Sequence, residues 1–184
     1  MKNYKKILLS LSLLLIFTLT ACSKNENAEV KEALENTSYE ISLYFPSKDY
    51  VESGNEENKF VMVSSLKSNS VDFVFDAVKD LKNAPKVSGE SAEVVEVYPA
   101  IPEKITINSV KVNGYTATVD LSSKDLSGGS LDEEILISSI FKTLTSTTNN
   151  GETFITSVQF TVDGEIVQSL MGHFDVSNVI EQEI

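Results

Sequence analysis

Two runs of alternating hydrophobicity on either side of Asn113-Gly114 constrain the fold more than any other feature of the chain. Residues 104–112 (KITINSVKV) and 115–121 (YTATVDL) have the two-residue period of strands that bury one face. Asn-Gly between such runs predicts a β-hairpin with a type I′ turn, because that turn needs positive φ at both central residues. The apolar positions of the first run change phase near Asn108-Ser109, which predicts a β-bulge there.

Two segments have the 3.6-residue spacing of amphipathic helices. Residues 70–82 carry apolar side chains on one face, with Ser70 or Asn69 available as the N-cap. Residues 130–147 open with Ser130-Leu-Asp-Glu133, a capping-box sequence in which Ser130 caps the helix while Glu133 reaches back. Asn149-Asn150-Gly151 ends this helix. Its predicted buried stripe is Leu136, Ile137, Ile140, Phe141 and Leu144.

Shorter runs predict the remaining strands and loops. The strands cover residues 40–45, 59–65, 94–98 and 154–162. Asp163-Gly164 predicts a second primed turn, leading into 165–168. The intervening segments 47–58, 83–93 and 122–129 read as loops, and 172–184 as a tail. The order ββαβββαββ predicts an α+β fold: a small mixed or antiparallel sheet with two helices packed on one face.

The first 21 residues read as a secretory signal rather than as part of the fold. Three lysines precede the apolar stretch Ile7–Leu19, which is too short for an ordinary spanning helix. The sequence Leu19-Thr-Ala-Cys22 follows and resembles a bacterial lipobox, in which the cysteine receives a lipid. We therefore expect lipid attachment at Cys22 of a cell-membrane lipoprotein that faces the extracytoplasmic side. A plain secretory signal with a coincidental cysteine, or an uncleaved anchor, are the alternatives.

Charge and composition limit what the remaining chain can do. The chain has 15 Lys+Arg and 27 Asp+Glu. Residues 1–21 hold three Lys and no acid, so 22–184 has a net charge of 12 − 27 = −15. This balance argues against nucleic-acid binding and predicts repulsion from an anionic lipid surface. We expect the polar residues 22–38 to be a flexible tether that holds a domain at 39–184 away from the bilayer.

A few polar residues qualify as site candidates, and each has a simpler interpretation. Asp120, Ser122 and Ser123 form a catalytic arrangement only with the single histidine, His173, and no G-x-S-x-G nucleophile elbow is present. We expect them instead to bind backbone groups in a turn. His173 and Asp175 offer at most half of a metal site, so His173 is expected to be a turn residue.

The other candidates are a glycine pair and the acidic side chains. Gly128-Gly129 before a helix suggests phosphate binding, but the acidic residues that follow would repel an anion. A loop that needs positive φ is the favoured interpretation. The acidic side chains are interpreted as solvated charge: Glu32, Glu35, Glu56, Glu57, Glu133 and Glu134. We therefore predict no catalytic residue, no metal site and no cofactor.

Three stretches together resemble the GerMN domain family of sporulation and spore-germination lipoproteins. They are Ala117–Ser123 running into Leu126, Gly128 and Gly129; Ile140–Thr145; and Val158–Gly164 followed by Leu170–Ser177. Leu43-Tyr-Phe-Pro46 also resembles the first strand of that family. The resemblance spans about residues 40–180. It implies a βαββα-type core related to ring-building modules, in an envelope protein without catalysis. The lipoprotein that names the family has two such domains, whereas this chain has one.

The resemblance and the residues lead to one functional expectation with two alternatives. The expected function is a lipid-anchored, non-catalytic interaction domain whose exposed strand edges contact other envelope proteins or further copies of itself. A role in sporulation or germination is its specific version. A lipoprotein that captures a small molecule or a wall fragment is the first alternative, and a wall-active hydrolase is the second.

Overall fold

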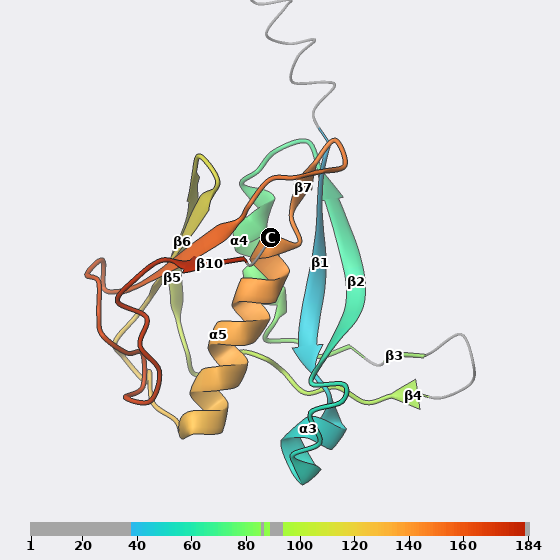
Figure 1. Cartoon of the computed structure of the whole chain (residues 1–184), viewed down its shortest axis with the longest axis vertical. Coiled ribbons are helices and arrows are strands. Elements are labelled where there is room, and N and C mark those ends of the chain that lie inside the picture. The colour runs from blue at the N-terminus through green and yellow to red at the C-terminus, as the bar shows by residue number, and fades with distance from the viewer. Residues whose placement is uncertain (1–37, 86, 89–93, 183–184) are drawn as a thin grey trace, which may run out of the picture. The chain divides into compact units, whose positions relative to one another are not determined.

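The structure, a computed structural model, describes residues 38–85, 87–88 and 94–182 of the chain (Figure 1). The predicted signal at 1–21, Cys22 and nearly all of the predicted tether lie outside these residues. In the described ranges no helix is both long enough and apolar enough to cross a membrane.

One four-stranded sheet is built around the first strand of the domain. Strand β1 (Tyr39–Pro46) pairs along its whole length with the antiparallel strand β2 (Phe60–Ser68), and a bulge interrupts the register between Leu43 and Tyr44. The other edge of β1 pairs for only two residues with β7 (Thr148–Asn149), which forms a small hairpin with β8 (Glu152–Thr153). The sheet order is therefore β2-β1-β7-β8.

The predicted hairpin belongs to a second four-stranded sheet. Strands β5 (Ile107–Asn113) and β6 (Thr116–Leu121) are antiparallel, and β6 pairs in parallel with β9 (Ser157–Val162). Strand β10 (Ile180–Glu181) completes the order β10-β9-β6-β5. A separate two-stranded pair joins β3 (Val87–Ser88) to β4 (Val94–Val95).

Two helices fill the space between the four-stranded sheets, as Figure 1 shows for α5. Helix α5 (Ser130–Thr145) contacts β1 and β9, and helix α4 (Phe73–Asp80) contacts β1, β5 and α5. The core that they share includes the completely buried Phe45 and Phe160. Truncation of either ring to alanine is expected to cost about 3–5 kcal/mol, because a cavity would remain.

The α+β class is confirmed, but the single predicted sheet is divided into two. The reason lies at the edge of β1 that faces α5. The backbone N–H groups of Ser42 and Tyr44 donate to Ser146 Oγ (2.8 Å) and Thr143 Oγ1 (3.1 Å). Helix hydroxyls thus take the place of a neighbouring strand along this edge. The helices consequently lie between two sheets rather than on one face of a single sheet.

The predicted hairpin and its bulge are present, but the turn is displaced by one residue. Asn113 pairs with Thr116, so the central turn residues are Gly114 and Tyr115, and only Gly114 has a positive φ (60°). That is the pattern of a type II′ turn rather than the predicted type I′. The extra residue of the bulge is Asn108, as expected. Positive φ at both central residues occurs instead at Asn150-Gly151, and at the second predicted primed turn, Asp163-Gly164.

Other predicted boundaries are also corrected. The loop predicted at 47–58 contains helix α3 (Lys48–Ser53), whose first turn is capped by Ser47 Oγ accepting the Tyr50 N–H at 3.1 Å. Helix α4 begins only at Phe73, and α5 ends at Thr145, before the 148–153 hairpin.

The C-terminal end of the described chain also differs from the prediction. Residues 165–168 contribute only an isolated bridge between Glu165 and Val162 instead of a strand. The predicted tail at 172–184 contains β10 and the buried Val176, so its described part belongs to the fold.

Candidate functional site

The Asp120 carboxylate is a structural anchor between two strands. Its Oδ1 accepts hydrogen bonds from Thr161 Oγ1 (2.7 Å) and the Gly164 N–H (2.7 Å), and its Oδ2 accepts one from Asn108 Nδ2 (2.9 Å). Burial opposes ionisation of this group, but these hydrogen bonds outweigh it and lower the pKa of Asp120. The carboxylate links β6 to the turn after β9. Both of its oxygens therefore already have hydrogen-bond partners within the domain.

The serine and histidine candidates are likewise engaged in turns. Ser122 Oγ accepts the Lys124 N–H at 3.2 Å, and the Ser123 N–H donates to Asp163 Oδ1 at 3.2 Å. His173 uses its backbone N–H to bind Glu133. Within the described chain, no hydrogen bond joins its imidazole to the serines or to Asp120. Ser122 thus binds a backbone group in the turn, as predicted, whereas Ser123 uses its own N–H and Asp120 binds two side chains and the turn after β9.

Asp175, which the sequence predicts to offer at most half of a metal site, makes local contacts. Asp175 accepts the N–H and the hydroxyl of Ser177, at 2.9 and 2.6 Å. Across the residues that the structure describes, no three His, Cys, Asp or Glu side chains are grouped so that they could hold a metal ion.

Gly128 is required for a reason other than the predicted one. Neither Gly128 nor Gly129 has a positive φ. A Cβ on Gly128 would lie 2.7 Å from Asp132 Cβ and 3.0 Å from Met171 Sδ, so lack of space excludes a side chain. Asp132 also accepts the Gly129 N–H at 2.8 Å and thereby caps α5, the role that the sequence assigns to Ser130 and Glu133.

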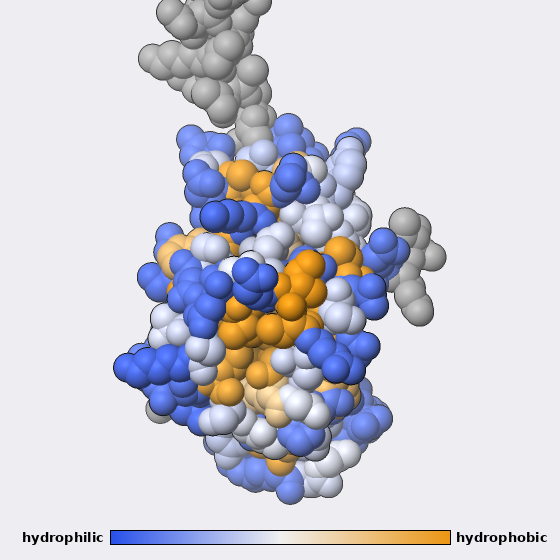
Figure 2. All heavy atoms as spheres, turned by 90° about the vertical axis from the view of Figure 1, so that its left-hand side faces the viewer, coloured by the Kyte–Doolittle hydropathy of each residue, from blue (hydrophilic) through white to orange (hydrophobic). Residues whose placement is uncertain are grey.

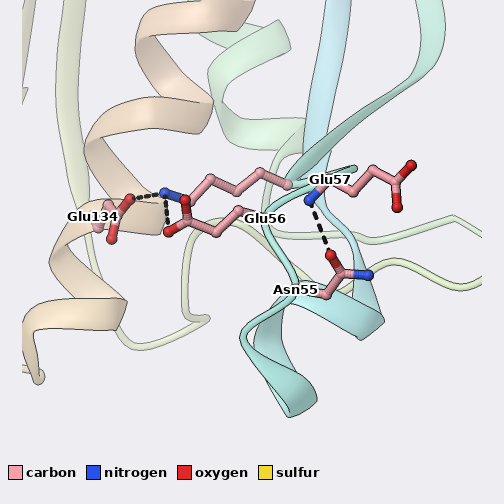
Figure 3. Close-up of polar contacts among 5 residues, drawn as sticks. Asn55, Glu56, Glu57 and Glu134 are labelled. Atoms are coloured by element: carbon pink, nitrogen blue, oxygen red, sulfur yellow. Dashed lines mark hydrogen bonds and ion pairs between the residues drawn. The ribbon is translucent and has the colours of Figure 1, made fainter.

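An open hollow of about 420 Å³ lies between the start of β2 and helix α5. Lys59 lines this hollow and forms ion pairs with Glu56 and Glu134, which Figure 3 marks with dashed lines. The Lys59 Nζ lies 2.5 Å from Glu134 and 3.6 Å from Glu56. The hydrogen bond to Glu134 raises the pKa of Lys59, so the amine stays protonated at neutral pH.

A protonated lysine paired in this way is neither a nucleophile nor a free ligand-binding cation. Nearby, Asn55 Oδ1 accepts the Glu57 N–H at 3.1 Å and orders the loop that borders the hollow (Figure 3). The ion pair between Lys59 and Glu134 therefore links the start of β2 to helix α5. For Glu134, the prediction of a simply solvated charge is wrong because the side chain is half-buried in this ion pair.

The most constrained polar group is Glu133, in the first turn of α5. Its side chain is completely buried. Its Oε1 accepts hydrogen bonds from Ser169 Oγ (2.8 Å) and from the Leu170 and Met171 N–H groups (both 2.9 Å), and its Oε2 accepts the His173 N–H at 2.7 Å. The prediction of a solvated charge is wrong for this residue also.

The electrostatics of Glu133 follow from these four donors. Burial alone would favour the neutral acid, but the hydrogen bonds from Met171, Ser169, His173 and Leu170 outweigh it and lower the pKa of Glu133. The carboxylate is therefore charged at neutral pH and holds residues 169–173 against the N-terminal end of α5. A buried carboxylate with four donors and no free lone pair facing solvent is a fixed clamp, not an acid–base catalyst.

Residue type gives no signal for this clamp. Three of the four donors are backbone N–H groups some 40 positions away, and any residue except proline supplies such a donor. We name residues 165–182 the C-terminal segment; Glu133 is its main polar attachment to α5.

The solved structures that are similar to this chain include the two described next, while no curated protein matches the chain. A protein from Clostridium perfringens described as a candidate lipoprotein is 21% identical and gives a TM-score of 0.47, with 77% of this chain and 86% of that chain covered. The tandem GerMN domains of the sporulation protein GerM from Bacillus subtilis are 14% identical, with a TM-score of 0.46. This chain covers 45% of that protein, and 80% of this chain is covered.

The family model named Germane, described as "Sporulation and spore germination", matches residues 42–168. This range begins in β1 and ends in the C-terminal segment, so it includes both core helices and both four-stranded sheets apart from β10 and the first three residues of β1. It also contains Glu133 and Asp120. The chain therefore belongs to the Germane family of sporulation and spore-germination domains.

Proposed function

We propose that this protein is a lipid-anchored extracytoplasmic envelope protein whose Germane domain acts through protein–protein contact, in sporulation or germination. The observation that carries the proposal is the family match over residues 42–168. Residues 1–21 would be the signal, 22–38 the tether and 39–184 the domain. The anchor would be a lipid on Cys22, the only cysteine of the chain.

The chemistry of the described side chains supports a non-catalytic role. The carboxylates of Asp120 and Glu133 each have their oxygens occupied by structural hydrogen bonds. The positive charge of Lys59 is paired with the carboxylate of Glu134. A general base or a nucleophile needs a free lone pair beside a substrate-sized space, and these groups do not offer one.

The anchor is tested by metabolic labelling with palmitate. Cells that produce the full chain are expected to incorporate the label into the protein and to retain it in the membrane fraction. The Cys22→Ala variant is the matched control and is expected to lose both. An unlabelled wild-type chain, or a variant that keeps the label, would contradict the proposed attachment.

The interaction role is tested by chemical crosslinking in intact cells. Membranes from growing and from sporulating cells would be crosslinked, and the proteins attached to the chain identified by mass spectrometry. Envelope assembly proteins recovered during sporulation are expected. Recovery only during growth would contradict the sporulation role, and turnover of a wall substrate by the purified chain would contradict the non-catalytic role.

A further inference from the structure

The C-terminal segment displays large apolar side chains that the core does not use. Ile166, Phe174 and Val179 are 62%, 39% and 42% exposed. In Figure 1 this segment, drawn in red, lies on the left of the molecule, and Figure 2 views that side. Figure 2 shows hydrophobic side chains in a band down the middle of that face of the molecule. Exposed apolar groups gathered on one face mark an interaction site more often than scattered ones do.

The segment is held rigid although it contains little regular structure. Glu133 binds the backbone directly before Phe174. Gln159 Nε2 donates to the Val176 carbonyl at 3.3 Å, and the Val176 N–H donates to the Gln168 carbonyl at 2.8 Å. A surface that is already ordered loses little conformational entropy when a partner binds. The apolar side chains are therefore presented on a preorganised backbone.

The charge of the segment identifies the chemistry of a partner. The C-terminal segment contains three acidic residues and no Lys or Arg, and Asp163 lies two positions before it. Hydrogen bonds from Ser123 lower the pKa of Asp163, and hydrogen bonds from Ser177 lower that of Asp175, so both are charged at neutral pH. Glu165 and Glu181 are exposed beside Ile166 and Ile180 in the sequence. Along the sequence, the exposed apolar residues of the segment are therefore interspersed with acidic residues, and the segment contains no Lys or Arg.

We propose that the C-terminal segment is the docking surface for a protein partner with an apolar centre and a rim of Lys or Arg. This inference rests on the proposed interaction function and specifies where the contact occurs. Phe174 would be the central anchor, since aromatic side chains dominate such contacts. The acidic side chains around it would steer and select a cationic rim.

The same charges disfavour the two other occupants. In a two-fold symmetric contact with a second copy, this segment would face itself with like charges opposite each other, and in a head-to-tail contact it would meet another face of a chain whose net charge is −12. An anionic bilayer surface would repel the segment as well. A basic protein surface is the occupant that both the apolar and the acidic groups fit.

The test is site-specific photocrosslinking in native membranes with the full, anchored chain. A benzophenone amino acid would replace Ile166 or Phe174 in the test proteins and Tyr115 or Met62 in the controls. Tyr115 is 66% exposed, a fraction similar to that of Ile166, but it lies in the β5–β6 turn. Adducts with a protein are expected at 166 and 174, at least about fivefold above the controls. Their yield should fall by a similar factor between about 0.05 and 0.5 M salt. Sequencing of the crosslinked peptides should place Lys or Arg next to the attachment point.

A charge variant provides an independent readout. Glu165→Lys with Glu181→Lys reverses two exposed charges whose side chains have no hydrogen-bonded role among the described residues, so the fold should persist, as circular dichroism would verify. This double variant is expected to lower the adduct yield at position 174 by about fivefold or more. An adduct with a second copy, an adduct with lipid, or a yield unaffected by this variant would overturn the proposal. Adducts only at Tyr115 or Met62 would overturn this surface but leave the interaction function standing, and no protein adduct at any position would remove both.

Discussion

Glu133 and Glu134 are neighbours on helix α5, yet they have opposite roles. They differ by about 100° around the helix axis, which turns one inward and the other outward. Glu133 is completely buried and accepts four hydrogen bonds, three of them from backbone N–H groups. The Glu134 side chain keeps 29% of its exposure and pairs with Lys59. The two carboxylates carry the same charge, so their hydrogen-bond donors decide their roles. Fixed backbone N–H groups hold Glu133 in one position, whereas the flexible Lys59 side chain forms only a weak ion pair with Glu134.

The largest effect in this comparison is expected from Glu133→Ala. The variant leaves the N–H groups of Leu170, Met171 and His173 without an acceptor, which should cost roughly 2–4 kcal/mol of the free energy of unfolding. Chemical denaturation of the purified chain measures this loss. Glu134→Ala, one position away on the same helix, is the matched control and should cost less than about 1 kcal/mol. Equal losses in the two variants would contradict the distinction drawn between them.

The next effect is a pH dependence of the free energy of unfolding that comes from Glu133. Folding lowers the pKa of Glu133 from its ordinary value of 4.5, so the stabilisation is complete above that pH and is lost as the pH falls through the folded-state pKa. Glu133→Gln keeps the shape but turns an amide donor toward backbone donors. At pH 7 it should be less stable than the wild type by about 1–3 kcal/mol.

Denaturation curves of both proteins between neutral and acidic pH test this expectation. The stability difference between the wild type and Glu133→Gln should shrink below pH 4.5. A difference that stays constant into acid would show that the carboxylate is not ionised in the folded protein.

The sequence predicts the parts of this molecule whose periodicity is local. The two core helices, the β5–β6 hairpin and its bulge at Asn108 follow from spacing alone, because burial of one face imposes the period. Helix α3 escapes prediction although Ser47 and Gly54 bracket it as cap residues, since six residues are too few to show an amphipathic period. The turn at Gly114-Tyr115 differs by one residue because strand register overrides the preference of Asn-Gly.

The clamp is beyond prediction for a different reason. The sequence identifies Glu133 as a helix-start residue, and a capping role is the ordinary use of glutamate at that position. Its real partners lie at 169–173 and are mostly backbone groups, which carry no residue-type signature. Only the folded chain shows that Asp132 takes the cap and leaves Glu133 free to face inward.

A smaller effect tests how closely the clamp region is packed. In Gly128→Ala the new methyl group would lie 2.7 Å from Asp132 Cβ and 3.0 Å from Met171 Sδ. Because the first of these atoms is fixed by α5, the substitution should destabilise the chain by about 1–2 kcal/mol. Gly129→Ala is the control, since its nearest neighbour would be 3.7 Å away. It should lose no more than about 1 kcal/mol, as a helix cap position allows. A larger loss at 129 than at 128 would contradict the packing described.

The smallest effect is expected on the Glu134 side of the comparison. A double-mutant cycle with Lys59→Met and Glu134→Gln should give a coupling energy below about 1 kcal/mol that declines further with added salt, because both side chains retain contact with solvent. Denaturation of the four proteins at low and high salt provides the measurement. A coupling of several kcal/mol would place Glu134 in the same class as Glu133.

Amide hydrogen exchange tests the central claim, that a buried carboxylate fixes the C-terminal segment as a rigid surface. In the folded wild type, the amides of Leu170, Met171 and His173 should exchange as slowly as those of the core strand β9. In Glu133→Gln they should exchange at least about tenfold faster while β9 remains protected. Rapid exchange of these three amides in the wild type, or equal protection in the variant, would contradict the claim.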